Sequence, residues 1–381
     1  MSPIARSLSL VATVTVGTGP YGLAYDSGKG EVFATDSAGY LTTNSTAYIV
    51  SVISDATNKV VANVSVPKDP YGVAYDSGRG EVFVTSVHGG EVFVISDTTD
   101  KVVATIPVGV YPYGIAYDSG KSELFVTNSY SDTVSVISDA TNTVVATVDV
   151  KGDPIGVAYD SAKGEVFITS NVGGTVSIIS DSSNMVVSSL SIGNDPNGAA
   201  YDPARGEVFV TEYSSGMVSV ISDSTDEVVA NVTVGVYPFD AAYDPANGEV
   251  FVGNSAGGTN DISVISDASD TVIATMDVGN EPYGLAYDSG KGEVFVASYS
   301  NGAVGTVSVL GETPATSSGT VTTSTPSGSI QSSSVVSSTS GSSSSISPSF
   351  LGAAAIDAVL VAALALVATR RDRASGITSG K

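Results

Sequence analysis

The sequence has no cysteine, no tryptophan and a single histidine, and each absence excludes a class of chemistry. Without cysteine, the chain forms no disulfide, offers no thiol nucleophile and holds no thiolate metal site. Because His88 is the only imidazole, multi-histidine metal sites are excluded, together with most histidine-based catalysis. The sequence also contains no Walker loop, no nucleophile elbow and no paired-ligand metal spacing.

Basic residues are scarce as well. The 381 residues include 15 Lys and Arg against 39 Asp and Glu, which gives a formal net charge of −24. The phosphates of nucleic acids require Lys and Arg, so a nucleic-acid partner is excluded. Such an acidic balance suits solubility in salt, an exposed surface or cation binding.

One short phrase, by contrast, is abundant. The sequence YDSGKGEVF at residues 25–33 recurs in close variants, and its aspartate lies at Asp26, Asp76, Asp118, Asp160, Asp202, Asp244 and Asp288. The intervals between these aspartates are 50, 42, 42, 42, 42 and 44 residues. A nearly fixed period of this length indicates a repeat architecture.

Each period contains four short runs suited to β-strands. In the third copy they read PYGIAYD, SELFVTNS, TVSVISD and NTVVATVDV. They are rich in β-branched and aromatic residues and are separated by Gly, Asn, Asp and Ser, whereas none suits an amphipathic helix. Four strands per repeat are typical of a propeller blade, so the sequence predicts an all-β, seven-bladed β-propeller. The repeated phrase is then the turn between a blade's first two strands, with its Tyr and Phe packed between blades.

The N-terminal end of the repeat region supplies the strand that its C-terminal end lacks. The last blade lacks a fourth strand after residue 312, while SLVATVTVG at residues 9–17 matches the fourth strand VVATIPVG at residues 102–109. We therefore expect the N-terminal strand to close the last blade and protect its edge. The predicted propeller spans residues 1–312, with blades at 18–66, 67–108, 109–150, 151–192, 193–234, 235–278, and 279–312 plus 8–17.

The run FVTNS at residues 125–129, between PYGIAYD and VSVISDATNTVVATVDV, resembles the YVTN-family β-propeller repeat of archaeal surface-layer-type proteins. The resemblance covers roughly Ser7 to Glu312 and recurs in every blade. This chain departs by using Phe for the first Tyr, and often Thr-Ser for Thr-Asn. The absence of tryptophan excludes the WD-repeat family. The resemblance implies an extracellular propeller and does not imply an enzyme.

The C-terminal part has a different composition. In residues 313–349, 24 of 37 residues are Ser or Thr and none is charged, so this segment is predicted to be a disordered stalk, either O-glycosylated or a bare linker. Residues 350–369 are mostly apolar and precede RRDR, which predicts one transmembrane helix and a cytoplasmic tail at 370–381. Asp357 within the span costs about 3 kcal/mol, which the apolar residues should outweigh.

Residues 1–17 lack the apolar core of a signal peptide, and we expect the true start to lie upstream.

Candidate ligand-binding residues lie where each first strand begins. The residue after the proline is aromatic in five of the seven copies, and the set comprises Tyr21, Tyr71, Tyr113, Ile155, Asn197, Phe239 and Tyr283. Repeat packing is the favoured interpretation; the alternative is an aromatic ring around the channel mouth that stacks on sugars. Asn197 and Asp240 are polar where the repeat has an aromatic residue and a glycine, which makes them stronger candidates.

Acidic residues are predicted on the same face, which carries the loops between second and third strands and those between blades. They are Asp36, Asp69, Asp153, Asp195, Glu212, Asp240 and Glu281. Calcium accepts such ligands, but no calcium-loop motif appears, so a solvated acidic rim without metal or other cofactor is expected. His88 is expected in an exposed loop. Three sequons, at Asn44, Asn63 and Asn231, are candidate N-glycosylation sites, and Asn44 in the long insert is the best of them.

The sequence therefore predicts a non-enzymatic, membrane-anchored cell-surface propeller that binds a glycan, another surface protein or the surface layer. The alternative is a calcium-dependent, lactonase-like hydrolase that uses the acidic channel mouth and His88. An enzyme of that kind needs several carboxylates, an asparagine and a histidine to converge at the axis, whereas a binding module does not.

Overall fold

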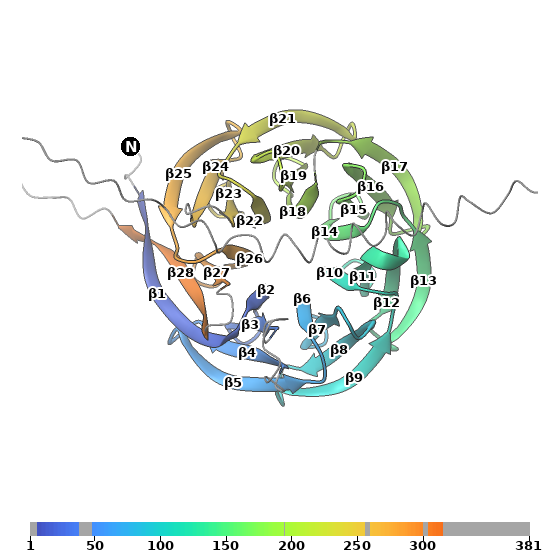
Figure 1. Cartoon of the computed structure of the whole chain (residues 1–381), viewed down its shortest axis with the longest axis horizontal. Coiled ribbons are helices and arrows are strands. Elements are labelled where there is room, and N and C mark those ends of the chain that lie inside the picture. The colour runs from blue at the N-terminus through green and yellow to red at the C-terminus, as the bar shows by residue number, and fades with distance from the viewer. Residues whose placement is uncertain (1–5, 38–47, 194, 256–259, 300–303, 315–381) are drawn as a thin grey trace, which may run out of the picture. The chain divides into compact units, whose positions relative to one another are not determined.

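The computed structural model describes residues 6–37, 48–193, 195–255, 260–299 and 304–314. These residues form seven four-stranded antiparallel sheets arranged around a common axis (Figure 1). The only helical turn in the described part is the 3₁₀ turn η1 (Ser129–Ser131). The predicted all-β, seven-bladed propeller is therefore confirmed.

The strands have the same order in every blade, from the axis outward. The first strands are β2 (Pro20–Asp26), β6 (Pro70–Asp76), β10 (Pro112–Asp118), β14 (Pro154–Asp160), β18 (Pro196–Asp202), β22 (Pro238–Asp244) and β26 (Pro282–Asp288). The second strands are β3 (Glu31–Asp36), β7 (Glu81–Ser86), β11 (Glu123–Asn128), β15 (Glu165–Ser170), β19 (Glu207–Glu212), β23 (Glu249–Asn254) and β27 (Glu293–Ser298). The third strands are β4 (Tyr48–Ser54), β8 (Glu91–Ser96), β12 (Thr133–Ser138), β16 (Thr175–Ser180), β20 (Met217–Ser222), β24 (Asp261–Ser266) and β28 (Val304–Pro314). The outer strands are β5 (Lys59–Val66), β9 (Lys101–Pro107), β13 (Thr143–Asp149), β17 (Met185–Ser191), β21 (Glu227–Thr233), β25 (Thr271–Asp277) and β1 (Arg6–Thr18).

Strand β1 completes the last blade, as the sequence predicted. It pairs antiparallel with β28, from Arg6 opposite Pro314 to Thr18 opposite Val304. Val14 and Val16 of β1 are buried in the cluster that joins the first and last blades. The first segment of the described chain thus covers an edge that would otherwise be open.

The repeated phrase forms the turn between the first and second strands. The backbone N–H groups of Gly28 and Lys29 donate to Asp26 Oδ1 at 2.8 and 3.1 Å, and Asp26 is fully buried. Gly30 closes the turn at a φ of +69°, and a Cβ there would lie 2.6 Å from a carboxylate oxygen of Asp55. Glycine therefore suits this position, both for its backbone conformation and for the close approach, although the third copy has Ser122 there at a φ of +60°.

The aromatic residues of the phrase pack between blades. Its phenylalanine is buried to 2% exposure or less in every copy, at Phe33, Phe83, Phe125, Phe167, Phe209, Phe251 and Phe295. Phe33 shares one cluster with Val82 and Val84 of the next blade, and burying such a side chain contributes about 1.5–3 kcal/mol. Tyr25 is only half-buried. Its hydroxyl donates to Asp55 Oδ2 at 3.4 Å.

The predicted stalk lies outside the described residues apart from 313 and 314, and the predicted span and cytoplasmic tail lie outside them entirely. Among the residues that are described, no helix is long and apolar enough to cross a membrane.

Pairs of aspartates join neighbouring blades on the face that carries the turns of the repeated phrase, which we call the turn face. Asp139, after β12, is 3% exposed, and Tyr117 donates to its Oδ2 at 3.3 Å. Burial raises the pKa of Asp139, and the adjacent Asp76 carboxyl of the preceding blade raises it further. The same arrangement, with a raised pKa for the first member, recurs in the pairs Asp181–Asp118, Asp223–Asp160 and Asp267–Asp202.

These pairs predict that the propeller becomes more stable as the pH falls. A carboxyl whose folded pKa lies above its unfolded value holds its proton more tightly when folded. Its stabilising contribution is complete below the unfolded value, near 4, and is lost as the pH rises through the folded value. We expect the unfolding temperature in calorimetry to be higher at pH 5 than at pH 8. Asp139→Asn should reduce this difference, whereas Asp149→Asn, at an exposed position of β13, should leave it unchanged. An equal pH dependence in wild type and Asp139→Asn would contradict the prediction.

Candidate functional site

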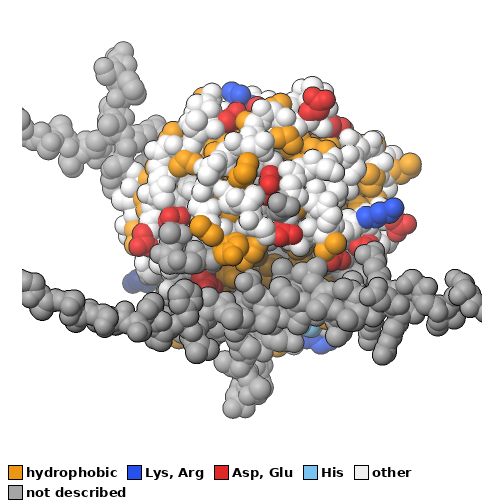
Figure 2. Space-filling model, turned by 45° about the horizontal axis from the view of Figure 1, so that its top comes forward, with side chains coloured by type: hydrophobic (Ala, Val, Ile, Leu, Met, Phe, Trp, Pro, Cys, Tyr) orange, Lys and Arg blue, Asp and Glu red, His pale blue; other side chains and the backbone are white. Residues whose placement is uncertain are grey.

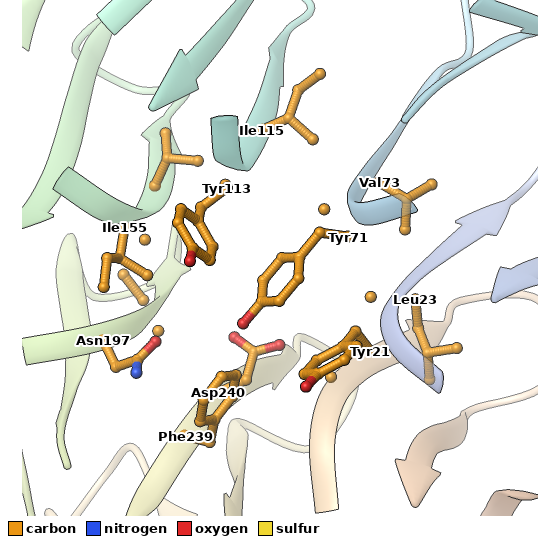
Figure 3. A pocket seen from close by; sticks show the side chains of 18 residues that line it. Tyr21, Leu23, Tyr71, Val73, Tyr113, Ile115, Ile155, Asn197, Phe239 and Asp240 are labelled. Atoms are coloured by element: carbon orange, nitrogen blue, oxygen red, sulfur yellow. The ribbon is translucent and has the colours of Figure 1, made fainter. Parts of the chain in front are cut away.

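Six of the seven candidate residues at the start of the first strands, all except Tyr283, line one cavity on the axis of the ring (Figure 3). Its volume is about 140 Å³. Since a buried water needs about 10–15 Å³ of such space, the cavity has room for on the order of ten waters. Eighteen residues from all seven first strands line it, so every blade contributes to the same site.

The five predicted aromatic side chains form a continuous arc in this site. The rings of Tyr21 and Tyr71 are stacked with centroids 4.6 Å apart, and Tyr71 meets Tyr113 edge to face at 4.9 Å. Tyr283 lies 5.0 Å from Tyr21 and 4.4 Å from Phe239. Each such pair contributes about 0.5–1.5 kcal/mol beyond area burial. The five rings thus pack on each other, and four of them, all except Tyr283, also line the cavity.

Three further tyrosines extend the arc, and the sequence pattern did not identify them. Tyr299 lies 5.3 Å from Tyr21, while Tyr213 lies 6.4 Å from Phe239 and is stacked on Tyr237 at 4.7 Å. Tyr299 and Tyr213 follow second strands, in the variable loops. Tyr237 stands directly before the proline that opens β22, and this Tyr-Pro step was a usable signal.

A threonine hydroxyl holds the backbone of three of these aromatic residues, Tyr71, Tyr113 and Phe239. Thr85 Oγ1 accepts the N–H of Gly72 at 2.8 Å and donates to the backbone carbonyl of Tyr113 in the next blade at 2.8 Å. The strands approach so closely here that a Cβ on Gly72 would lie 2.2 Å from that carbonyl oxygen. Five blades share this threonine bridge, through Thr35, Thr85, Thr127, Thr169 and Thr211.

Blade six breaks this arrangement at two positions. Gly253 replaces the threonine, and Asp240 replaces the glycine of the first strand. The Asp240 Oδ2 atom instead accepts the backbone N–H of Leu285 in blade seven at 3.2 Å. In Figure 3 the carboxyl of Asp240 points into the cavity, toward the hydroxyl end of Tyr71. Asn197, which is 8% exposed, lies on the same side of the cavity.

The site therefore carries one carboxyl in a largely apolar, aromatic surrounding. Burial raises the pKa of Asp240 to about 6, against the hydrogen bonds from the backbone of Ala241 and Leu285, which lower it. At neutral pH this carboxyl is mostly ionised. Burial also raises the pKa of Tyr71 well above its ordinary value, so its hydroxyl stays protonated and keeps a hydrogen to donate.

The other acidic candidates do not converge on the cavity. Asp69 contacts His88 Nδ1 at 2.5 Å, and although burial raises the pKa of Asp69, hydrogen bonds from His88 and Tyr48 bring it below its ordinary value. His88 is exposed, as expected, and its ring lies 5.4 Å from Tyr111, while the cavity lining does not include it. Ser214 donates to Asp195.

Asp36 and Glu212 correct the expectation of a solvated acidic rim. Both are buried, at 1% and 4% exposure. They are the last residues of β3 and β19, and their side chains turn toward the third strand, where Ser51 donates to Asp36 at 2.6 Å and Ser219 donates to Glu212 at 2.5 Å. The last residue of each second strand is a polar residue, and a carboxylate at this position is buried, as at Asp36 and Glu212.

No three His, Cys, Asp or Glu side chains in the described ranges lie close enough together to hold a metal ion. Among the described residues that line the cavity, Asp240 is the only carboxylate. The convergence of carboxylates with a histidine that the hydrolase alternative needs is not seen among these residues.

Of the three sequons, Asn44 lies outside the described residues. Asn63 on β5 and Asn231 on β21 are exposed on outer strands, and the side-chain amide of each lies within hydrogen-bond distance of a serine hydroxyl of the third strand, at 3.1 and 3.0 Å.

The fold and the cavity define a seven-bladed β-propeller with a small axial cavity. No family model matches the sequence, and no curated protein matches it. Among solved structures, the hydrazine synthase of Kuenenia stuttgartiensis is similar, with a TM-score of 0.66 over 77% of this chain and 96% of that chain. The two sequences are 17% identical, so the similarity shows the propeller fold alone.

The burial of Asp36 yields a prediction about stability. Burial raises the pKa of Asp36 to about 7, against hydrogen bonds from Ser51 and Gly17 that lower it. The stability that this carboxyl contributes is present at acidic pH and is lost as the pH rises through 7, by at most about 4 kcal/mol. Blades three and six have asparagine at this position, at Asn128 and Asn254.

We therefore expect Asp36→Asn to raise the unfolding temperature at pH 8.5 by several degrees and to have a smaller effect at pH 5.5. The reverse substitution, Asn128→Asp, should lower it at pH 8.5 more than at pH 5.5. Calorimetry at the two pH values measures both, and a stabilisation by Asp36→Asn that is independent of pH would count against a buried ionisation.

Proposed function

We propose that this chain is a non-enzymatic binding module whose ligand occupies the axial cavity. The observation that supports this most strongly is the convergence of the breaks in the repeat. Seven nearly identical blades predict seven nearly identical linings, yet Asn197 and Asp240 depart from the pattern and line the same cavity. A polar side chain that packing does not require, placed in a cavity with aromatic walls, is typical of a ligand site.

The chemistry of the lining favours binding over catalysis. The cavity offers one carboxyl, one amide and several phenolic hydroxyls, with no imidazole and no second carboxylate. General acid–base catalysis by two groups of separate pKa has no second partner in this set. The similarity to an enzyme, at 17% identity, adds nothing to the hydrolase alternative.

We also propose that the propeller is displayed on the outer surface of a cell. The support comes from the sequence, where a Ser/Thr-rich segment, 20 mostly apolar residues and an arginine cluster follow the propeller in that order. The resemblance to YVTN-family propellers of surface-layer-type proteins points the same way. A glycan, another surface protein or the surface layer is then the expected partner, and glycosylation of the exposed Asn63 or Asn231 is compatible with this location.

Replacing Asp240 tests the binding site. Asp240→Gly restores the residue that the repeat has in the other six blades, so we expect the full-length protein to keep its fold and lose its ligand. The measurement is binding of wild type and variant, purified in detergent, to a glycan array and to isolated cell envelopes. Asp195→Asn, an acidic residue of the same face outside the cavity, is the matched control and should bind like wild type. Equal binding by Asp240→Gly and wild type would refute a role for the cavity.

Accessibility to protease tests the proposed location. Protease added to intact cells should remove the propeller and leave a membrane-bound C-terminal fragment, because the arginines hold residues 370–381 inside. Immunoblotting for both ends of the chain checks this result. Cleavage that appears only after permeabilisation would reverse the proposed orientation.

A further inference from the structure

We propose that the ligand of the axial cavity is a small organic cation, a singly charged alkylammonium group that pairs with Asp240 inside the arc of Tyr21, Tyr71 and Phe239. This inference rests on the proposed binding function and specifies its ligand class. It is carried by the charge of the cavity, by the surroundings of the Asp240 carboxyl and by the size and composition of the walls.

The charge of the cavity is negative and has no opposite charge beside it. Asp240 is the only charged residue among the eighteen that line the cavity. The chain as a whole is also acidic, with a net charge of −24, and Figure 2 shows acidic side chains at several places on the visible face. A concave site with this field attracts cations and repels carboxylates and phosphates.

The surroundings of the carboxyl leave room for a charged partner. An ionised carboxylate in an apolar cavity is unfavourable unless it is paired or fully hydrogen-bonded. Asp240 receives backbone hydrogen bonds from Ala241 and Leu285, and its raised pKa shows that these do not fully offset its burial. A bound cation would supply the missing compensation and would draw this pKa down.

The walls favour an organic cation over a metal ion. Calcium takes six to eight oxygen ligands, whereas the described cavity brings a single carboxylate and no cluster of three potential metal ligands. In Figure 3 the rings of Tyr71, Tyr21 and Phe239 surround the Asp240 carboxyl. Aromatic rings attract an ammonium group within about 6 Å of their centroids, with a strength that grows when water is excluded.

The volume favours a small group over a sugar. Sites for drug-sized ligands commonly measure about 300–1,000 Å³, and this cavity measures about 140 Å³. The Tyr21 and Tyr71 rings also stack on one another at 4.6 Å, which occupies a face that a sugar ring would need. An ammonium head group is compact and needs few hydrogen bonds, so it fits what the lining offers.

The test compares a cation with its neutral isostere. Full-length protein in detergent is titrated by calorimetry with choline and with 3,3-dimethylbutan-1-ol, which has the same shape without the charge, at constant ionic strength. We expect choline to bind at least tenfold more tightly than the alcohol. We also expect its affinity to fall as the pH is lowered through about 6, because protonation neutralises Asp240.

Variants locate the binding. Asp240→Asn should weaken choline binding at least tenfold and remove its pH dependence, and Tyr71→Leu should weaken it while Tyr71→Phe, which keeps the ring, should not. Asp195→Asn should behave like wild type. Thermal unfolding checks that each variant is folded, and the comparison of choline with the alcohol in wild type needs no variant.

The outcomes separate this inference from the proposed function. Equal affinity for choline and the alcohol, no choline binding, or tight calcium binding instead would each overturn the organic-cation assignment. If choline fails while another ligand binds wild type and is lost in Asp240→Gly, the binding function stands and only the ligand class is wrong. If no ligand depends on Asp240, both proposals fail.

Discussion

A threonine hydroxyl joins the innermost strands of five neighbouring blade pairs, and the geometry of the axial site depends on this bridge. In each case it accepts a glycine N–H of its own blade and donates to the carbonyl of the residue that follows the proline in the next blade, as Thr127 does for Gly114 and Ile155. The bridge satisfies backbone groups of both strands where the ladder between β10 and β11 is irregular. The bridges from Thr35 and Thr85 hold the backbones of Tyr71 and Tyr113 in equivalent positions, and the rings of these two residues are in contact.

The site arises where this bridge is missing. Gly253 and Ala297 offer no hydroxyl in blades six and seven, and the carboxyl of Asp240 instead accepts the N–H of Leu285 across that interface. The substitution restores one hydrogen bond but places an ionisable group in an apolar cavity. A repeat that maximised stability alone would keep threonine here, as five blades do, and glycine, as the other six do. Local departures from a consistent pattern are expected where function competes with stability.

The sequence predicted those features that recur with the period, namely seven blades, closure by the N-terminal strand, the turn at Asp26 and the residues that line the axis. It missed two kinds of feature. One is the direction in which a side chain points at the end of a strand, and the other is a contact between residues of different blades. Tyr213 and Tyr299 lie in loops whose sequences differ between blades, so no periodic signal marked them. The burial of Asp36 follows from the inward direction of the last residue of β3. The Asp76–Asp139 pair forms between residues of different blades, which a pattern within one repeat cannot show.

Burial perturbs the carboxyls of the turn-face pairs and that of Asp240, and the difference between these two settings bears on the role of Asp240. On the turn face each is compensated within the protein, as where Lys121 lies 3.6 Å from Asp181 and its Nζ also donates to the Asp181 carbonyl. Those groups hold blades together and are explained by structure alone. Asp240 has no cationic residue beside it among the described residues that line the cavity. A partly buried charge with no cationic side chain in the cavity lining, beside aromatic walls, is most simply explained by a counter-ion that comes from outside.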